Sequence, residues 1–104
     1  MPEIVVHATA RLEIKGHGIY LEEQAGPEVA DRFLAAVQDT FETLAAMPRM
    51  GTLCGFQRPA ARRLRRWAVK GFENWLVFYQ PKRRGIEVVH LIHGARDIES
   101  LLDG

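Results

Sequence analysis

The fold of this chain is decided by two short apolar runs, WLVFY at residues 75–79 and IEVVHLI at residues 86–92. Successive side chains of a strand point to opposite faces, and neither face of these two runs is polar. Strands of this kind need cover on both sides. The rest of the chain offers two helical segments, enough for one face. The other face is therefore predicted to be exposed or to receive a second protein.

Two helices are predicted ahead of these runs. The first has Thr9 as its N-cap and extends to about residue 24, and Gly16 is expected to let another helix approach it closely. Gly26-Pro27 ends this helix and begins the second, because proline suits the first position of a helix. Apolar residues then recur at spacings of three and four until Pro48, which predicts a helix with a wide apolar face. Together the two form a helical hairpin.

Strands are predicted on either side of this hairpin. They cover residues 3–7 ahead of it and residues 62–69, 73–80 and 86–93 after a loop at 48–61. Asp97 is placed to cap a final helical turn through Leu102. Residues 1–104 thus form one predicted α+β domain, with an N-terminal strand, a helical hairpin and a three-stranded antiparallel meander in a single sheet.

Composition excludes several classes of protein. A chain of 104 residues with 47% hydrophobic and 26% charged residues suits one soluble globular domain, and no window approaches the ~20 apolar residues of a membrane span. The N-terminus is acidic and only briefly apolar, unlike a signal peptide. The single cysteine, Cys54, has no partner for an internal disulfide and no companions for a zinc site. We expect a cytoplasmic protein with no metal and no cofactor.

The net charge of +1 hides a strongly basic segment. Residues 58–84 hold nine basic side chains against one acidic (+8), residues 1–57 hold four against eight (−4), and residues 85–104 hold one against four (−3). Such a segment attracts an anion, which is either a nucleic-acid backbone or an acidic protein segment. The sequence leaves both open.

Few residues carry recognisable chemistry. A ribonuclease would need a base, an acid and cations around the phosphate, and His93, Arg96, Lys70 and Arg65 would supply them if they converged. Histidines within strands are more often structural, so no catalytic residue is assigned. The chain also lacks a glycine-rich phosphate loop, a metal-ligand cluster and a serine–histidine–acid set.

Aromatic and arginine side chains are the expected contacts to a partner. On an uncovered sheet face, Trp67 and Trp75 would be typical anchors for a partner helix. Arg63 and Arg65 supply positive charge beside them. Arg96 carries a fixed set of donors that suits either backbone carbonyls or a carboxylate of a partner.

Three blocks occur in order along the chain. They are DRFL at 31–34 leading to FETLAAMP at 41–48 with Gly51 beyond it, VKGFENWLVFY at 69–79, and HGARDI at 93–98. Over almost the whole chain, this pattern resembles the ParE branch of the RelE/ParE superfamily of bacterial toxins from type II toxin–antitoxin pairs. The resemblance implies a helical hairpin on a curved antiparallel sheet. It also implies a cognate antitoxin that wraps around the toxin, and inhibition of DNA gyrase by protein contact.

The chain departs from the RelE branch of the same superfamily. RelE-type members cut messenger RNA on the ribosome, and they carry an arginine just before the core of the third strand and a tyrosine near the C-terminus. Here that strand position is Leu76 or Trp75, and no tyrosine follows Tyr79. The incomplete set favours gyrase inhibition. One alternative is an endoribonuclease that cleaves messenger RNA, with or without the ribosome. The other is a toxin-like protein that still binds an antitoxin as a structural partner but has lost its toxicity.

Overall fold

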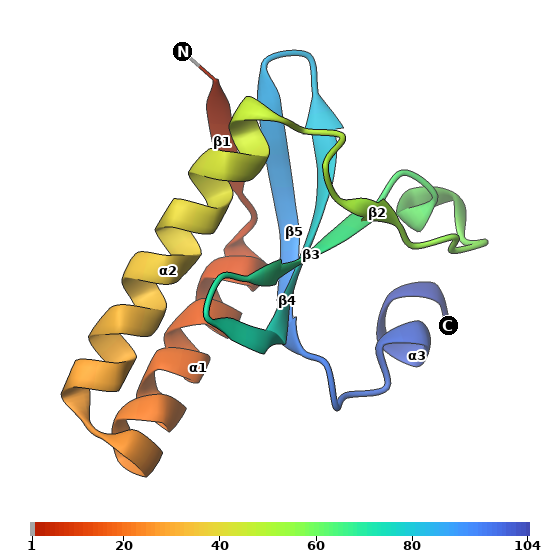
Figure 1. Cartoon of the computed structure of the whole chain (residues 1–104). Helices are drawn as coiled ribbons and strands as arrows, with labels where there is room; N and C mark the ends of the chain where they lie inside the picture. Colours follow the sequence, from red (N-terminus) through yellow and green to blue (C-terminus); the bar gives the residue numbers. More distant parts are fainter. Residues whose placement is uncertain (1) are drawn as a thin grey trace.

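The computed structural model describes residues 2–104, and its elements follow the predicted order. They are β1 (Glu3–Val6), α1 (Ala8–Ala25), α2 (Pro27–Ala46), β2 (Thr52–Leu53), the 3-10 helix η1 (Pro59–Ala61), β3 (Arg65–Val69), β4 (Phe72–Lys82), β5 (Gly85–His93) and α3 (Ile98–Asp103). The α1–α2 hairpin lies on one side of the sheet, and η1 and α3 lie on the other (Figure 1). The predicted α+β class is confirmed. Among the described residues, no helix is both long and apolar enough to cross a membrane.

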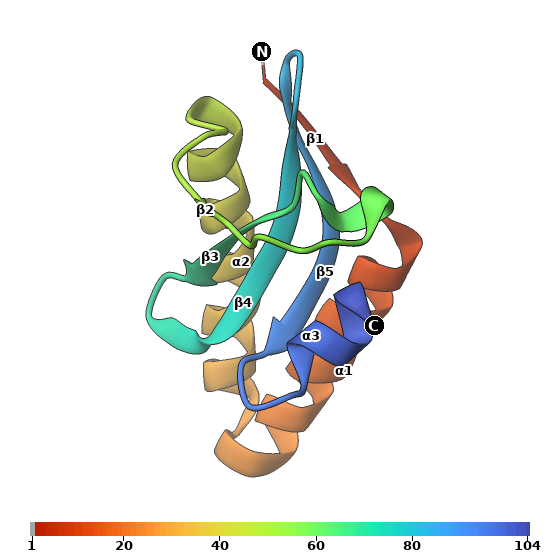
Figure 2. The ribbon, with the colours of Figure 1, turned by 90° about the vertical axis from the view of Figure 1, so that its right-hand side faces the viewer.

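The sheet has five strands in the order β1-β5-β4-β3-β2. The meander of β3, β4 and β5 is antiparallel, as predicted, and the β4–β5 hairpin extends toward the N-terminal end of the molecule (Figure 2). Two features differ from the prediction. β1 pairs with β5 in parallel, with Ile4 opposite Ile86. The predicted loop at 48–61 contains β2, which pairs with Arg65 and Arg66 and is too short to show an alternating pattern.

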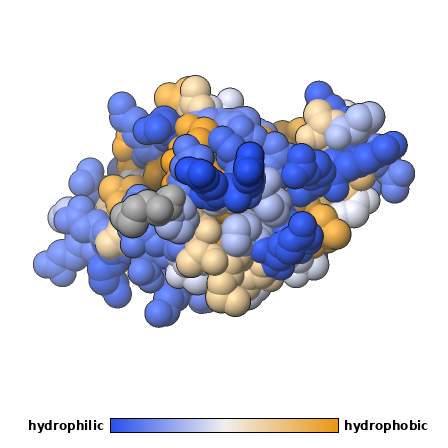
Figure 3. All heavy atoms as spheres, turned by 90° about the horizontal axis from the view of Figure 1, so that it is seen from above, coloured by the Kyte–Doolittle hydropathy of each residue, from blue (hydrophilic) through white to orange (hydrophobic). Residues whose placement is uncertain are grey.

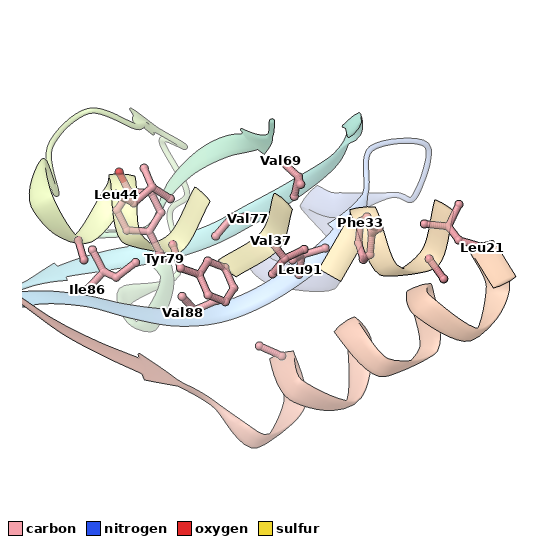
Figure 4. Close-up of a cluster of buried hydrophobic side chains, with 14 residues drawn as sticks. Leu21, Phe33, Val37, Leu44, Val69, Val77, Tyr79, Ile86, Val88 and Leu91 are labelled. Carbon is pink, nitrogen blue, oxygen red and sulfur yellow. The ribbon is translucent and has the colours of Figure 1, made fainter. Parts of the chain in front are cut away.

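The main core lies between the helical hairpin and the sheet (Figure 4). Phe33 of α2 is fully buried and meets Phe72 and Trp75 edge-on, with ring centroids 5.3 Å and 5.6 Å apart. The other large buried side chains come from both layers and include Val37, Phe41, Leu44, Val69, Val77, Tyr79, Ile86, Val88 and Leu91. The apolar stripe predicted on the second helix is thus confirmed.

The far face of the sheet is covered by the chain itself, so the predicted exposed or partner-covered face is wrong. Phe78 and Ile92 point to this face and are 0% and 3% exposed. Ala61 and Leu64, which lie in and just after η1, close over them together with Leu102 of α3. The prediction failed because it counted only long helices as cover, whereas two short segments share the task here.

Aspartates hold α3 at both ends. Asp97 is its N-cap and accepts a hydrogen bond from the Ser100 N–H at 3.3 Å, as predicted. Asp103 accepts hydrogen bonds from the backbone N–H of Gln57, at 2.9 Å, and of Arg58. Hydrogen bonds from Ser100 lower the pKa of Asp97, and those from Gln57 and then Arg58 lower the pKa of Asp103. Asp103 therefore joins the C-terminal helix to the segment before η1.

The packing of α1 differs from the prediction. The helix begins at Ala8 with His7 as its N-cap, so Thr9 lies inside the first turn and caps nothing. A Cβ added at Gly16 would meet no heavy atom within 4 Å, whereas one at Gly18 would lie 3.6 Å from Leu34. The close approach between the helices is therefore at Gly18, and the prediction for Gly16 is wrong.

Side chains of α1 satisfy the backbone of β5 beyond the end of β1. The pairing of β1 with β5 stops at Val88. Further along, Glu13 accepts a hydrogen bond from the Leu91 N–H at 3.0 Å, and Nε2 of His17 donates to the Leu91 carbonyl at 2.7 Å. The Glu13 carboxylate also lies 3.1 Å from Nδ1 of His90. These polar residues replace the missing strand, since an unpaired buried backbone group is costly.

Candidate partner-binding surface

Within residues 2–104, no arginine or lysine of the basic segment 58–84 forms an ion pair with an acidic side chain. Among residues 2–104, the contacts within 4.0 Å between basic and acidic side chains join His7 to Glu87 at 3.3 Å and His90 to Glu13 at 3.1 Å, and neither involves an arginine or a lysine. Eight of the nine basic residues in this segment are exposed, and Arg65 is half-buried. Their charge is thus directed at solvent, which gives the surface a strongly positive region.

Arg65 is used inside the molecule. Its Nη1 donates to the carbonyls of Gly51, at 2.7 Å, and of Arg49, at 3.2 Å. The Tyr79 hydroxyl donates to the Pro48 carbonyl and accepts from the Gly51 N–H, both at 2.8 Å. Burial raises the pKa of this hydroxyl, although the hydrogen bond from Gly51 opposes the shift. Arg65 and Tyr79 together fix residues 47–51, which connect α2 to β2.

Two other predicted contact residues remain accessible on β3 and beside it. Arg63 is exposed, and its Nη2 reaches the Pro81 carbonyl at 3.5 Å. Trp67 is 38% exposed and lines a hollow of about 420 Å³ between α2 and β3. Lys70 lines the same hollow, and so do the acidic residues Asp39 and Glu73. The charge around Trp67 is therefore mixed, and the hollow is suited to an apolar side chain of a partner.

Trp75 lies on the core side of the sheet. Its ring meets Phe33, Phe72 and His93 edge-on, with centroid distances of 5.6, 6.3 and 4.8 Å. The indole Nε1 is buried and has no hydrogen-bond partner. The residue packs against the main core, so a partner can reach at most part of its side chain.

The four residues considered for RNA cleavage do not gather at one point. On β4, Trp75 is opposite His93 and Tyr79 is opposite Arg65. These two β4 positions are about 13 Å apart at the rise of a strand. Nδ1 of His93 accepts a hydrogen bond from the Ala95 N–H at 3.0 Å, which leaves the proton of the neutral ring on Nε2.

Lys70 and Arg96 are exposed in the turns that follow β3 and β5. The side chain of Arg96 makes no hydrogen bond to residues 2–104, and only its backbone N–H donates, to the His93 carbonyl at 3.0 Å. Both turns lie at the end of the sheet where His93 is found, so Lys70, Arg96 and His93 share one end and Arg65 lies away from it. The Arg96 guanidinium is free to meet a partner.

The comparisons with known proteins identify the family. The model described as "ParE toxin of type II toxin-antitoxin system, parDE" matches residues 4–98. The chain belongs to this family. A solved structure titled "Chromosomal ParDE TA system from P. aeruginosa" matches this ParE-family chain with a TM-score of 0.71 at 13% identity. The match covers 89% of this chain and 96% of that one, and at this identity it shows the fold alone. The comparison with curated proteins found no match.

Sequence reasoning included Lys82 and Arg83 in the basic segment but missed that Arg49 joins them at the tip of the β4–β5 hairpin. Arg49 follows α2 and lies outside the basic segment in sequence, yet it lines the same cleft as Lys82 and Arg83. Seen from this end, the ParE-family chain is largely hydrophilic with smaller apolar areas (Figure 3). The motif that ends in Met47-Pro48 with Gly51 beyond it was the available signal, because its turn brings Arg49 to the hairpin.

Proposed function

We propose that this ParE-family protein is a toxin that acts in the cytoplasm, inhibits DNA gyrase by protein–protein contact, and is neutralised by a cognate antitoxin. Family membership supports the toxin role. The observation that carries the contact mechanism is the +8 charge of residues 58–84, whose arginines and lysines form no ion pair with an acidic side chain of residues 2–104. A surface of this kind favours an acidic protein partner and speeds its association.

The contact residues differ in their roles. Arg63, Trp67 and Arg96 are exposed and meet the partner directly. Arg65 and Trp75 support that surface from beneath, since Arg65 binds the carbonyls of residues 49 and 51 and Trp75 packs on Phe33. An acidic antitoxin segment competes for the same positive surface, and its association slows as salt screens the charges.

The hydrogen bonds of the candidate catalytic residues favour inhibition by protein–protein contact over RNA cleavage. Nδ1 of His93 is occupied by a backbone N–H, and Arg65 is occupied by two carbonyls. To act as a general base, His93 would need to release the Ala95 N–H, and Arg65 lies away from the end of the sheet where His93 is found.

The test is a supercoiling assay with purified gyrase, run beside an RNA-cleavage assay with the same preparation. We expect the protein to inhibit supercoiling and to leave RNA intact, and we expect Arg63→Glu with Arg66→Glu to weaken inhibition about ten-fold or more. A His93→Gln variant should keep most of the activity. RNA cleavage by the purified protein that disappears in His93→Gln would instead establish the endoribonuclease.

A further inference from the structure

A cleft of about 680 Å³ separates the end of α2 from the tip of the β4–β5 hairpin, and we refer to it as the tip cleft. Residues 47–50 form one wall and residues 81–83 form the other. A smaller hollow of about 390 Å³ adjoins it, shares Pro48 and Arg83 with it, and adds Arg84. The cleft adjoins the contact surface proposed above, because Arg63 reaches the Pro81 carbonyl at 3.5 Å and Arg65 binds the carbonyls of residues 49 and 51.

Every charged residue that lines the tip cleft is basic. Arg49, Lys82 and Arg83 are exposed there, and none of them forms an ion pair with residues 2–104. The remaining lining is apolar and comes from Met47, Met50, Pro48 and Pro81. Met47 is 61% exposed, and methionine adapts its shape to varied apolar ligands. A basic rim around an apolar lining fits carboxylates that flank a large apolar side chain.

The walls of the tip cleft are fixed before any ligand arrives. Arg65 and Tyr79 hold the 47–51 wall through hydrogen bonds to residues 48, 49 and 51. A Cβ on Gly51 would lie 2.4 Å from the Tyr79 hydroxyl, so the wall takes this shape only with glycine there. The hairpin wall is tied to β1 by the hydrogen bond from the Glu3 N–H to the Arg84 carbonyl. A preformed site loses less conformational entropy when it binds.

We infer that the tip cleft binds an acidic peptide segment that places a large apolar side chain between its carboxylates. A nucleic-acid backbone would satisfy the basic rim, but it would leave the two methionines and two prolines without a counterpart. The acidic peptide uses both features. Such a site operates whether or not gyrase is the target of the toxin.

The first experiment is a titration of the full ¹⁵N-labelled chain with a blocked synthetic peptide of alternating glutamate and leucine. We expect backbone amide shifts concentrated at Met47, Arg49, Met50 and Gly51 and at residues 82–85. We also expect the affinity to fall as salt is raised. A peptide with serine in place of each leucine should bind about ten-fold more weakly or worse, because it cannot fill the apolar lining.

Charge variants distinguish binding in the tip cleft from nonspecific electrostatic attraction between the peptide and the basic surface. Lys82→Glu with Arg83→Glu should lower the affinity for the glutamate–leucine peptide by about ten-fold or more. The matched pair Arg62→Glu with Arg66→Glu, which changes the charge equally outside the cleft, should lower it less than about two-fold. Equal losses in both pairs, shifts located elsewhere, no detectable binding, or equal binding of the serine peptide would each overturn the proposal. It would also be overturned by a single-stranded oligonucleotide of matched charge that shifts the same amides at equal or higher affinity.

Discussion

The two faces of the sheet are covered in different ways. On one face, the 20-residue helix α2 contributes Phe33, Val37 and Leu44 from a single continuous stripe. On the other, Ala61, Leu64 and Leu102 come from a three-residue η1, the chain just after it and a six-residue α3. The long amphipathic helix α2 supplies most of the cover on its face, with α1 beside it, whereas the far face depends on two short segments that each need the other. The far face should therefore open more easily than the main core.

The largest effect should come from the main core. Phe33→Ala removes a fully buried ring that meets Phe72 and Trp75, and it should cost about 3–5 kcal/mol of unfolding free energy. Denaturant unfolding measures this cost. Leu34→Ala is the matched control, because Leu34 is the next residue and is 43% exposed. Similar losses for the two variants would contradict the role assigned to α2.

A smaller and local effect is expected on the far face. Leu102→Ala should cost about 2–3 kcal/mol, because this side chain is 5% exposed and packs with Phe78 and Ile92 on the far face of the sheet. Hydrogen exchange should become faster in residues 54–64 while α2 keeps its protection. Leu101→Ala, on the same helix but 45% exposed, is the control. If α2 and residues 54–64 lost protection together, the two faces would form one cooperative unit and the comparison would fail.

The segment 47–51, which connects α2 to β2, gives a third test. Gly51→Ala places a Cβ against the Tyr79 hydroxyl and should cost about 1–3 kcal/mol. Tyr79→Phe removes that hydroxyl but keeps the ring carbons Cε1 and Cζ, which would lie 2.8 and 2.9 Å from the added Cβ. It should therefore relieve part of the cost of the alanine, and a double-mutant cycle should show coupling between the two positions. Additive effects would mean that residues 47–51 are not fixed by this contact.

The main core could be predicted from the sequence, and the far face could not. The stripe of α2, the apolar side chains on both faces of β4 and the Asp97 cap are local patterns, and each is present in the structure. The hydrogen bond from Gln57 to Asp103 joins residues 46 positions apart, and that from Leu91 to Glu13 joins residues 78 apart. No local pattern predicts such pairs, so the sequence suggested an open face where the chain covers itself.

The candidate contact residues show the same division. Arg63 and Arg96 were predicted from charge and are exposed. The charge of Arg65 gave no sign that its donors bind the carbonyls of residues 49 and 51. Trp75 lies two residues from Val77 on the same side of β4, and both faces of this strand are apolar, so the sequence did not show that the ring faces the main core.

The smallest expected effect is a dependence of the far face on pH. The lowered pKa of Asp103 means that its ionised form is favoured by folding, so its contribution is present above about pH 4 and is lost as the pH falls through the lowered value. Acidification should therefore loosen residues 54–64 before it affects α2.

The variant Asp103→Asn tests this role of the carboxylate. It should loosen residues 54–64 already at neutral pH, and acid should then loosen them less than in the unmodified chain. Glu99→Gln, on the same helix, should behave like the unmodified chain. NMR signal intensities of the amides of Phe56 and Leu64, followed against pH, measure the effect. Loosening in acid that is identical in the Asp103→Asn variant and in the unmodified chain would show that another group holds α3 in place.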